Sequence, residues 1–334
     1  MEKVRVGIVG LGWVAQIFHL PILSKMDDVE IVAVCDKDKS RAKFIAERFG
    51  INSWYSDYEE MVKRDDLHAV DICTSTDAHL PVALAAMQGG SDVFVEKPIA
   101  RHYDEALKMS EAAKEYKRKI MVGMNNRFRP DAMILKSFIE GGDLGKIFYV
   151  KAGWLRKLTA DNAWLTRKEK AGGGVFLDLG IVLLDLSLWM LAFPTVHRVS
   201  AKMFNHGTKN VEDTCLGFFE MKNGITVFFE SSWAFQAEQD FFYCEFFGSE
   251  GSAKLNPLQI HKQLHGSLVN VTPAKSETPQ NLYKKSYENE LKHFIGSVRG
   301  FHKIVSTAEE AVHRMKVVEA LYKSAAKRKE IIIK

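Results

Sequence analysis

The stretch VRVGIVGLGWVA, residues 4–15, decides the fold of this chain. Its apolar first half, residues 4–9, is typical of a short buried strand, and a glycine-rich turn follows directly and opens a helical segment. This turn matches the dinucleotide-binding pattern G-x-G-x-x-A, and its residues are Gly10, Leu11, Gly12, Trp13, Val14 and Ala15. Gly10 permits the tight turn, Gly12 lets the backbone approach a pyrophosphate, and Ala15 permits close packing of the helix on the strand.

The next strand ends on an acid that bears on the choice of cofactor. The run EIVAVCD, residues 30–36, places Asp36 at the end of that strand. A carboxylate there accepts hydrogen bonds from the ribose hydroxyls of NAD and repels the 2′-phosphate of NADP, so NAD is favoured. Lys37 and Arg41 lie nearby and would hold a 2′-phosphate, which keeps NADP as the less favoured cofactor. A structural glycine turn without a cofactor is the remaining alternative.

Strands and helices alternate strictly up to about residue 125. Strands are predicted at 69–76, 92–98 and 120–125, and helices at 39–50, 79–90 and 104–119. This alternation predicts an α/β fold, in which a doubly wound parallel sheet of the Rossmann type carries helices on both faces. We assign residues 1–123 to this NAD(P)-binding domain.

The pattern changes after about residue 126. Helices are predicted at 131–140, 173–191 and 307–327, and longer strands at 147–155, 214–222, 225–233 and 241–248. The dipeptide Asn223-Gly224 predicts a hairpin with a type I′ turn. Residues 124–334 therefore form an α+β domain with a large, open, mostly antiparallel sheet, and its C-terminal helix is expected to pack back on the first domain.

The bulk composition excludes several classes of protein. The net charge is only +4 and there is no long block of Lys and Arg, so no nucleic-acid partner is expected. The long apolar runs carry charges and the N-terminus has no targeting pattern, so we expect a cytoplasmic protein that does not bind a membrane. No CxxC pair occurs, which predicts buried thiols and no metal site for the four cysteines, Cys35, Cys73, Cys215 and Cys244.

Several further segments carry a resemblance to a known family. They are VFVEKPIA (93–100), NNRFRPDAMILKSFIEGGDLGKI (125–147), AGGGVFLDLGIVLLDLSLWML (171–191), FFGSEGSAKL (246–255) and YENELKHFIGSVRG (287–300). With the fingerprint, their order and spacing resemble the glucose–fructose oxidoreductase, inositol dehydrogenase and rhizopine-catabolism family (Gfo/Idh/MocA) over nearly the whole chain. The resemblance implies an NAD-dependent oxidoreductase that transfers a hydride between nicotinamide and a hydroxyl-bearing carbon of a sugar, sugar derivative or cyclitol.

The resemblance also implies two catalytic residues. Lys97 of the E-K-P motif would act on the substrate hydroxyl, and Asp178 of the second signature would orient the substrate. An ordinary surface lysine and a helix-capping carboxylate are the respective alternatives. Further cofactor contacts are implied for the residues around the two motifs, namely Thr74, Ser75, Thr76, His79, Glu96 and Lys97.

One position departs from the family pattern. Val182 stands where the family usually has a histidine, sometimes a tyrosine, as the proposed acid/base, and valine carries no proton. Three explanations remain open. Lys97 transfers the proton alone or through water; another side chain supplies it, such as His206, Tyr149 or a residue near 154–156; or the chain is a non-catalytic dinucleotide- or sugar-binding regulator, a case that the family includes.

Basic and aromatic residues before the second signature suggest the type of substrate. Arg127, Arg129, Arg156, Lys157, Arg167 and Lys168 are expected to line an anionic pocket, or else to form a solvated basic surface. Trp154 and Trp164 would stack on a sugar ring or belong to the core, and Asp185 would contact the substrate or pair with a cation inside the helices. The substrate is thus a small, sugar-like and possibly anionic molecule.

The predicted sheet of the second domain is rich in phenylalanine. Its strands carry Phe218, Phe219, Phe228, Phe229, Phe241 and Phe242. Alternation along the strands leaves an apolar face in need of a partner. We therefore expect a homodimer or homotetramer built on this sheet.

Overall fold

The computed structural model describes residues 2–157, 164–274 and 277–334. The chain forms two compact units, neither of which is continuous in sequence. Unit 1 comprises Met1–Asn125 and Tyr287–His313, and unit 2 comprises Asn126–Ser286 and Arg314–Lys334. The division that we expect at residues 123 and 124 remains a prediction about domains.

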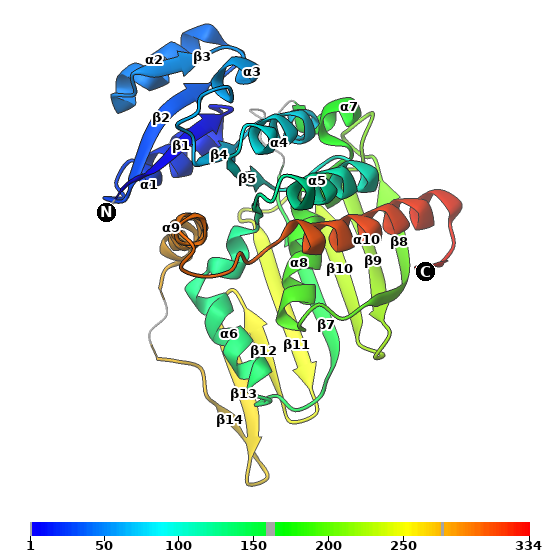
Figure 1. Ribbon diagram of the computed structural model, residues 1–334. Coiled ribbons are helices and arrows are strands. Elements are labelled where there is room, and N and C mark those ends of the chain that lie inside the picture. The colour runs from blue at the N-terminus through cyan, green and yellow to red at the C-terminus, as the bar shows by residue number, and fades with distance from the viewer. Residues whose placement is uncertain (1, 158–163, 275–276) are drawn as a thin grey trace. The chain divides into compact units, whose positions relative to one another are not determined.

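Unit 1 contains a six-stranded sheet in the order β3-β2-β1-β4-β5-β6 (Figure 1). All of its neighbouring strands are parallel. The strands are β1 Val4–Val9, β2 Val29–Cys35, β3 Ser53–Tyr55, β4 Ala69–Ile72, β5 Asp92–Glu96 and β6 Ile120–Gly123. Every residue of β4, β5 and β6 is buried, as expected for strands that are covered on both faces. The predicted Rossmann-type fold is confirmed.

The helices of unit 1 connect these strands. They are η1 Ala15–His19, α1 Leu20–Leu23, α2 Lys39–Phe49, α3 Tyr58–Met61, η2 Thr76–Ala78, α4 His79–Gln88 and α5 Tyr103–Glu115. Because crossovers between parallel strands are right-handed, the strand order places the helices before β3 and those after β4 on opposite faces. Asp38 caps the start of α2 and Gly50 ends it with φ of 66°.

The second segment of unit 1 completes the edge of its sheet. It contains the later part of α9 (Pro279–Val298) and the start of α10 (Ala308–Lys327). The Val122 N–H of β6 donates to the Ser306 carbonyl at 2.9 Å, and Met121 forms a bridge with Thr307. Arg299 also pairs with Asp28 at 2.9 Å.

Unit 2 is built on a nine-stranded sheet in the order β14-β13-β12-β11-β7-β10-β9-β8-β15. The strands are β7 Ile147–Leu155, β8 Val196–Phe204, β9 Thr214–Met221, β10 Thr226–Ser232, β11 Phe241–Gly248, β12 Gly251–Leu255, β13 Gln259–Leu264, β14 Ser267–Asn270 and β15 Ile331–Ile332. Neighbouring strands are antiparallel except for the parallel pair β7 and β10. The predicted open, mostly antiparallel sheet is therefore confirmed.

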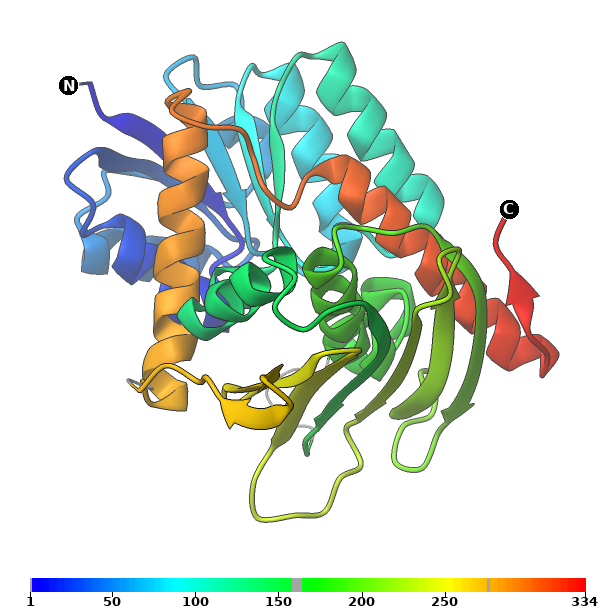
Figure 2. The same cartoon turned by 90° about the horizontal axis from the view of Figure 1, so that it is seen from below.

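Helices of unit 2 lie on one face of this sheet (Figure 2). They include η3 Asn125–Phe128, α6 Pro130–Glu140, α7 Lys168–Ala171, η5 Phe176–Gly180 and α8 Ile181–Met190, together with the end of α10. The segment Lys168–Met190 is long and apolar enough to cross a membrane, but 94% of its most apolar window is buried within the protein. It is the core helix of unit 2.

The hairpin at Asn223-Gly224 joins β9 and β10, as expected, but its turn differs from the prediction. Type I′ requires positive φ at both central residues, and only Gly224, with φ of 86°, has it. The Gly224 N–H donates to the Met221 carbonyl at 2.9 Å, which makes a longer turn with glycine at its last position. The type I′ prediction is therefore wrong.

Candidate active site

The two glycines of the fingerprint have different structural roles. Gly10 has φ of 88°, and a Cβ there would lie 2.7 Å from the backbone of Cys73 and Thr74. A Cβ on Gly12 would meet no atom of the described residues within 4 Å. Gly10 is therefore required by the packing of β1 on β4, whereas Gly12 keeps open the space that the motif reserves for a pyrophosphate.

Asp36 is tied to the fingerprint by hydrogen bonds. Its Oδ2 accepts the Leu11 N–H at 2.9 Å, and its Oδ1 accepts the Asp38 N–H at 2.9 Å. Arg41 pairs with Asp36 at 3.1 Å, so the nearest guanidinium is engaged by the acid, and Lys37 is exposed. A carboxylate at the end of β2 suits the ribose diol of NAD.

The loops after β4 and β5 are linked by a buried histidine. His79 Nδ1 lies 2.9 Å from the Pro98 carbonyl, and its Nε2 lies 3.2 Å from the Thr74 carbonyl. Burial lowers the pKa of His79, although the two carbonyls oppose the change. The Thr74 hydroxyl is buried and has no hydrogen-bond partner among the described residues, so a bound nucleotide could satisfy it. Together with the open Gly12 and with Asp36, this arrangement fits NAD.

Lys97 follows the carboxyl end of β5, the edge at which ligands bind in such sheets. It is partly exposed, and its peptide bond to Pro98 is cis. Its backbone N–H donates to Glu96 Oε2 at 3.1 Å, while Glu96 Oε1 lies 3.1 Å from His19 Nε2. The turn that carries the predicted catalytic lysine is thus attached to a buried polar cluster.

In unit 2, Asp178 lies in a π-helical turn, Phe176–Gly180, where an ordinary α-helix is expected from the sequence. Its Oδ2 accepts Arg156 Nη2 at 2.8 Å and Trp233 Nε1 at 3.1 Å. Such turns recur at functional sites. The two donors fix the orientation of the carboxylate, which is only 7% exposed.

Trp233 is a contact of Asp178 that the sequence did not reveal. Leu155 of β7 lies opposite Ser232 of β10 in the parallel pair, so the residues that follow them, Arg156 and Trp233, reach the same edge of the sheet. The Arg156 N–H also donates to the Ser232 carbonyl at 2.9 Å. The parallel pairing brings these two donors to Asp178, and no local pattern indicates that pairing.

The glycine turn before Asp178 is held by a second missed group, Glu212. The Glu212 carboxylate accepts the N–H groups of Gly174 and Phe176 at 3.0 Å, and Tyr322 donates its hydroxyl at 2.7 Å. A Cβ on Gly174 would lie 1.9 Å from the Glu212 carbonyl oxygen, so only glycine fits there. Burial raises the pKa of Glu212, although these donors oppose the change.

Asp185 has two cationic partners in the core of unit 2. Arg127 donates to it from Nε at 2.8 Å and from Nη2 at 2.6 Å, and Arg314 Nη1 donates at 2.7 Å. Arg127, Asp185 and Arg314 are each about 1% exposed. Asp185 thus pairs with cations inside the helices, which was the alternative to a contact with substrate. Contact of Arg127 or Asp185 with a substrate remains a prediction.

The other predicted substrate residues are more dispersed. Trp154 is partly exposed and packs edge-on against Phe242 at 5.1 Å, and Trp164 is also partly exposed. Arg129 pairs with Asp131 at 2.7 Å, whereas Arg167 and Lys168 are exposed. Residues 158–163 of the basic segment lie outside the described residues.

Val182, on α8, is 4% exposed. Tyr149 and His206, the two residues suggested as proton carriers in place of the missing histidine, lie in different parts of unit 2. Tyr149 lies in the first part of β7, seven residues before Arg156, or about 23 Å at ~3.3 Å per residue. His206 follows β8, whose last residue, Phe204, pairs with Thr214 at the edge that also carries Ser232. Of these two, His206 lies at the edge that carries Arg156.

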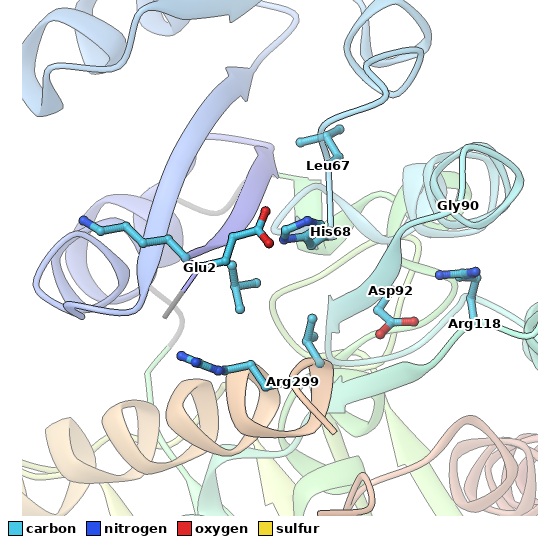
Figure 3. A pocket seen from close by; sticks show the side chains of 10 residues that line it. Glu2, Leu67, His68, Gly90, Asp92, Arg118 and Arg299 are labelled. Carbon is cyan, nitrogen blue, oxygen red and sulfur yellow. The ribbon is translucent and has the colours of Figure 1, made fainter. Parts of the chain in front are cut away.

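A separate hollow of about 340 Å³ lies at the amino ends of β1, β4 and β5 (Figure 3). It is lined by Glu2, His68, Asp92, Arg118 and Arg299, among others. The fingerprint and Lys97 lie at the carboxyl ends of β1 and β5, and Asp36 lies at that of the neighbouring β2, so this hollow is not the candidate site.

Comparisons with known proteins agree with this arrangement. Residues 4–124 match the family described as "Oxidoreductase family, NAD-binding Rossmann fold", and residues 133–254 match the "GFO/IDH/MocA C-terminal domain". The chain is 30% identical to D-glucoside 3-dehydrogenase of Escherichia coli K12, over 97% of this chain and 96% of that protein. It is 28% identical to scyllo-inositol 2-dehydrogenase (NAD(+)) of Bacillus subtilis 168, over 95% and 92%.

A solved structure shares the whole fold. Levoglucosan dehydrogenase, in complex with NADH and levoglucosan, superimposes with a TM-score of 0.90 at 21% identity, covering 99% of this chain and 100% of that one. The fold and the fingerprint therefore define an oxidoreductase with an NAD-binding Rossmann domain. The chain belongs to the Gfo/Idh/MocA family, and the predicted family membership is confirmed.

Proposed function

We propose that the protein oxidises a hydroxyl-bearing carbon of a sugar, a sugar derivative or a cyclitol to a carbonyl, or catalyses the reverse reduction of the carbonyl, with NAD as the cofactor. The observation that carries this proposal is the bond from the Lys97 backbone N–H to Glu96, which holds the turn that carries Lys97 at the carboxyl edge of the Rossmann sheet. A protein that only binds NAD does not require a lysine held in this way. The sugar and cyclitol dehydrogenases among its relatives support the substrate class.

Bound NAD supplies a nicotinamide ring that exchanges a hydride with the substrate carbon. The Lys97 ammonium or amine would hold or take the proton of the reacting hydroxyl, a task worth about 10²–10⁴-fold in rate. Asp178 would accept a hydrogen bond from a neighbouring substrate hydroxyl, because Arg156 and Trp233 fix its carboxylate in one orientation. Asp36 would bind the adenosine ribose, and the N-terminal turn after Gly12 would face the phosphates.

The missing acid/base at Val182 leaves two routes for the proton. Lys97 handles it alone or through water, or a second side chain assists, for which His206 lies at the appropriate edge of unit 2. A non-catalytic regulator that binds NAD or a sugar is the second candidate function, and Val182 is the residue that favours it.

The substrate is further proposed to carry an anionic group. The Nε–H of Arg156 is buried and has no partner among the described residues, while its Nη2 holds Asp178. Trp154 lies beside it, with its ring 6.0 Å from the Arg156 guanidinium. Arg156 is therefore the residue that we assign to a carboxylate or phosphate of the substrate, with Trp154 and Trp164 against the sugar ring.

We also propose a homodimer or homotetramer, in the cytoplasm, that forms through the face of the nine-stranded sheet opposite its helices. Because side chains alternate along the strands, the phenylalanines of this sheet lie on both of its faces. Phe219 and Phe229 are 1% exposed, whereas Phe218, Phe228 and the half-exposed Phe241 point to the other face. Charged residues on that face pair with one another, as Arg198 does with Glu220 at 2.7 Å. Light scattering of the purified protein measures the oligomer, and a monomer at high concentration would refute this part.

The experiment is a survey of NADH formation with neutral sugars, uronates, sugar phosphates, nucleotide sugars and cyclitols, followed by the Lys97→Ala variant on the best substrate. We expect kcat to fall about 10²–10⁴-fold while NAD still binds. Lys108→Ala, at an exposed lysine of α5, is the matched control and should keep full activity. No turnover of any substrate by folded protein that binds NAD tightly would leave the regulator as the function.

A further inference from the structure

A buried polar cluster adjoins the predicted catalytic turn of unit 1. His19, in the π-helical turn Ala15–His19 that follows the fingerprint, is 0% exposed. Its Nδ1 lies 2.8 Å from Asp71 Oδ2 and its Nε2 lies 3.1 Å from Glu96 Oε1. One imidazole therefore bridges β4 and the last residue of β5.

The geometry bears on the protonation state of His19. A neutral imidazole donates from one nitrogen only, whereas here each nitrogen faces a carboxyl oxygen, so with both carboxyls ionised the two bonds require an imidazolium. Burial lowers the pKa of His19, but the Asp71 carboxylate opposes that effect, and the pKa lies well above its ordinary value. Two rings also lie near His19, those of Phe94 at 5.5 Å and of Tyr287 of α9 at 5.9 Å.

Cys73 takes part as a thiol. Its Sγ lies 3.4 Å from His19 Nδ1 and 3.5 Å from Asp71 Oδ1. Burial, with Asp71 beside it, raises the pKa of Cys73, which favours the thiol. The 2.8 Å contact of His19 with Asp71 is a hydrogen bond, and the cluster is a hydrogen-bonded network.

The network continues directly to the catalytic lysine. Glu96 uses Oε1 for His19 and Oε2 for the backbone N–H of Lys97. Across the sheet, a Cβ on Gly123 of β6 would lie 3.3 Å from the Glu96 carboxyl carbon, so the carboxylate is packed closely from that side. His19 and Gly123 thus leave Glu96 little freedom.

We propose that His19 is a positioning residue for the reaction: it fixes the Glu96 carboxylate that holds the Lys97 turn, and it joins this turn to the helix that follows the dinucleotide fingerprint. The inference rests on the function proposed for Lys97. His19 lies only four residues after Ala15, so a shift of the helix that follows the fingerprint would be transmitted through His19 to Lys97.

A double-mutant cycle tests this role. His19→Gln and Glu96→Gln should each lower kcat about 10–100-fold, because a small misplacement of a catalytic group costs about that much. Since His19 acts through Glu96, the double variant should be no slower than the slower single variant. Multiplicative losses would overturn the proposal.

The pH profile separates positioning from a merely structural role. Without the His19 cation, the Glu96 charge is no longer offset, so the acid limb of the kcat/KM profile should move to higher pH in His19→Gln. His293→Gln, at a half-buried histidine of the same unit that accepts the Val305 N–H, is the matched control. It should leave kcat and the profile unchanged, and an unmoved profile in His19→Gln would overturn the proposal.

A measurement on the wild-type protein does not depend on whether any variant folds. In ¹⁵N spectra of histidine-labelled protein, one imidazole should remain doubly protonated above about pH 8, where ordinary histidines are neutral. His293, whose pKa burial lowers to about 4, should be neutral there. A complete set of neutral rings would refute the bridge.

The result also distinguishes this proposal from the proposed function. An active enzyme that needs Lys97 but tolerates His19→Gln refutes only the positioning role. A protein without turnover that keeps one doubly protonated imidazole refutes the proposed dehydrogenase and, with it, the role of His19 in positioning a catalytic lysine.

Discussion

The buried charge cluster around Asp185 allows a quantitative test of what this acid does. The change is Asp185→Asn, which keeps the shape of the side chain and removes its charge. Asp185 accepts three charge-assisted hydrogen bonds, at 2.8 and 2.6 Å from Arg127 and at 2.7 Å from Arg314. Such bonds contribute about 1.5–3 kcal/mol each.

An asparagine retains only one oxygen, and its amide N–H groups would face a guanidinium. With that oxygen at the Oδ1 position, the bonds from Arg127 Nη2 and Arg314 Nη1 remain but lose their charge assistance, and the bond from Arg127 Nε is lost. Two buried cations also lose the carboxylate between them. We expect the free energy of unfolding to fall by about 3–5 kcal/mol, the usual loss when one partner of a buried pair is removed. For a unit of this size the midpoint of thermal unfolding should fall by about 10 °C.

The assay is thermal and urea unfolding followed by circular dichroism, with the substrate KM measured at a temperature at which the variant is folded. Glu140→Gln is the control, because the Glu140 side chain is 58% exposed and its pair with Lys136 should contribute less than about 1 kcal/mol. If Asp185→Asn keeps wild-type stability but raises KM about tenfold, the structural argument is refuted and contact with substrate is supported.

Two further predictions concern the fingerprint and the glycine turn. Gly12→Ala should leave the stability unchanged and weaken NAD binding about 10–100-fold, which an NAD titration measures. Gly10→Ala should instead lower the free energy of unfolding by about 1–3 kcal/mol, which calorimetry measures. Equal effects of the two variants on binding and on stability would contradict this distinction. Because the pKa of Glu212 is raised, the folded protein keeps this proton after the unfolded chain has lost it, so its contribution to stability falls as pH rises above about 4.5. In urea titrations at several pH values, Glu212→Gln should show a smaller fall in the free energy of unfolding as pH rises. If its stability falls with pH as steeply as that of the wild type, the contribution of Glu212 is disproved.

The predictions that hold are those that depend on local sequence. The strand at residues 4–9, the glycine turn and Asp36 all lie within one strand–helix–strand unit, so their spacing alone defines how they meet. The strands at 147–155 and 241–248 were also identifiable from apolar and aromatic runs. Short strands such as β3 were not, since three residues carry too little pattern.

The groups that sequence reasoning missed meet through contacts between distant segments. Trp233 reaches Asp178 because β7 and β10 are parallel within a sheet that the sequence predicts to be mostly antiparallel. Glu212 and Tyr322 hold the glycine turn from 38 and more residues away, and no spacing rule connects them to it. His19 lies 77 residues from Glu96 and reads locally as part of an ordinary helix.

The discontinuity of the two units has a consequence for synthesis of the chain. When residues 1–125 have left the ribosome, the edge of β6 still lacks its partners near Ser306 and Thr307, and Asp28 lacks Arg299. The NAD-binding unit can therefore be completed only after nearly the whole chain has been made. A fragment that ends at residue 125 would be an incomplete unit with an uncovered strand edge, which makes it a candidate for aggregation and a poor stand-alone module.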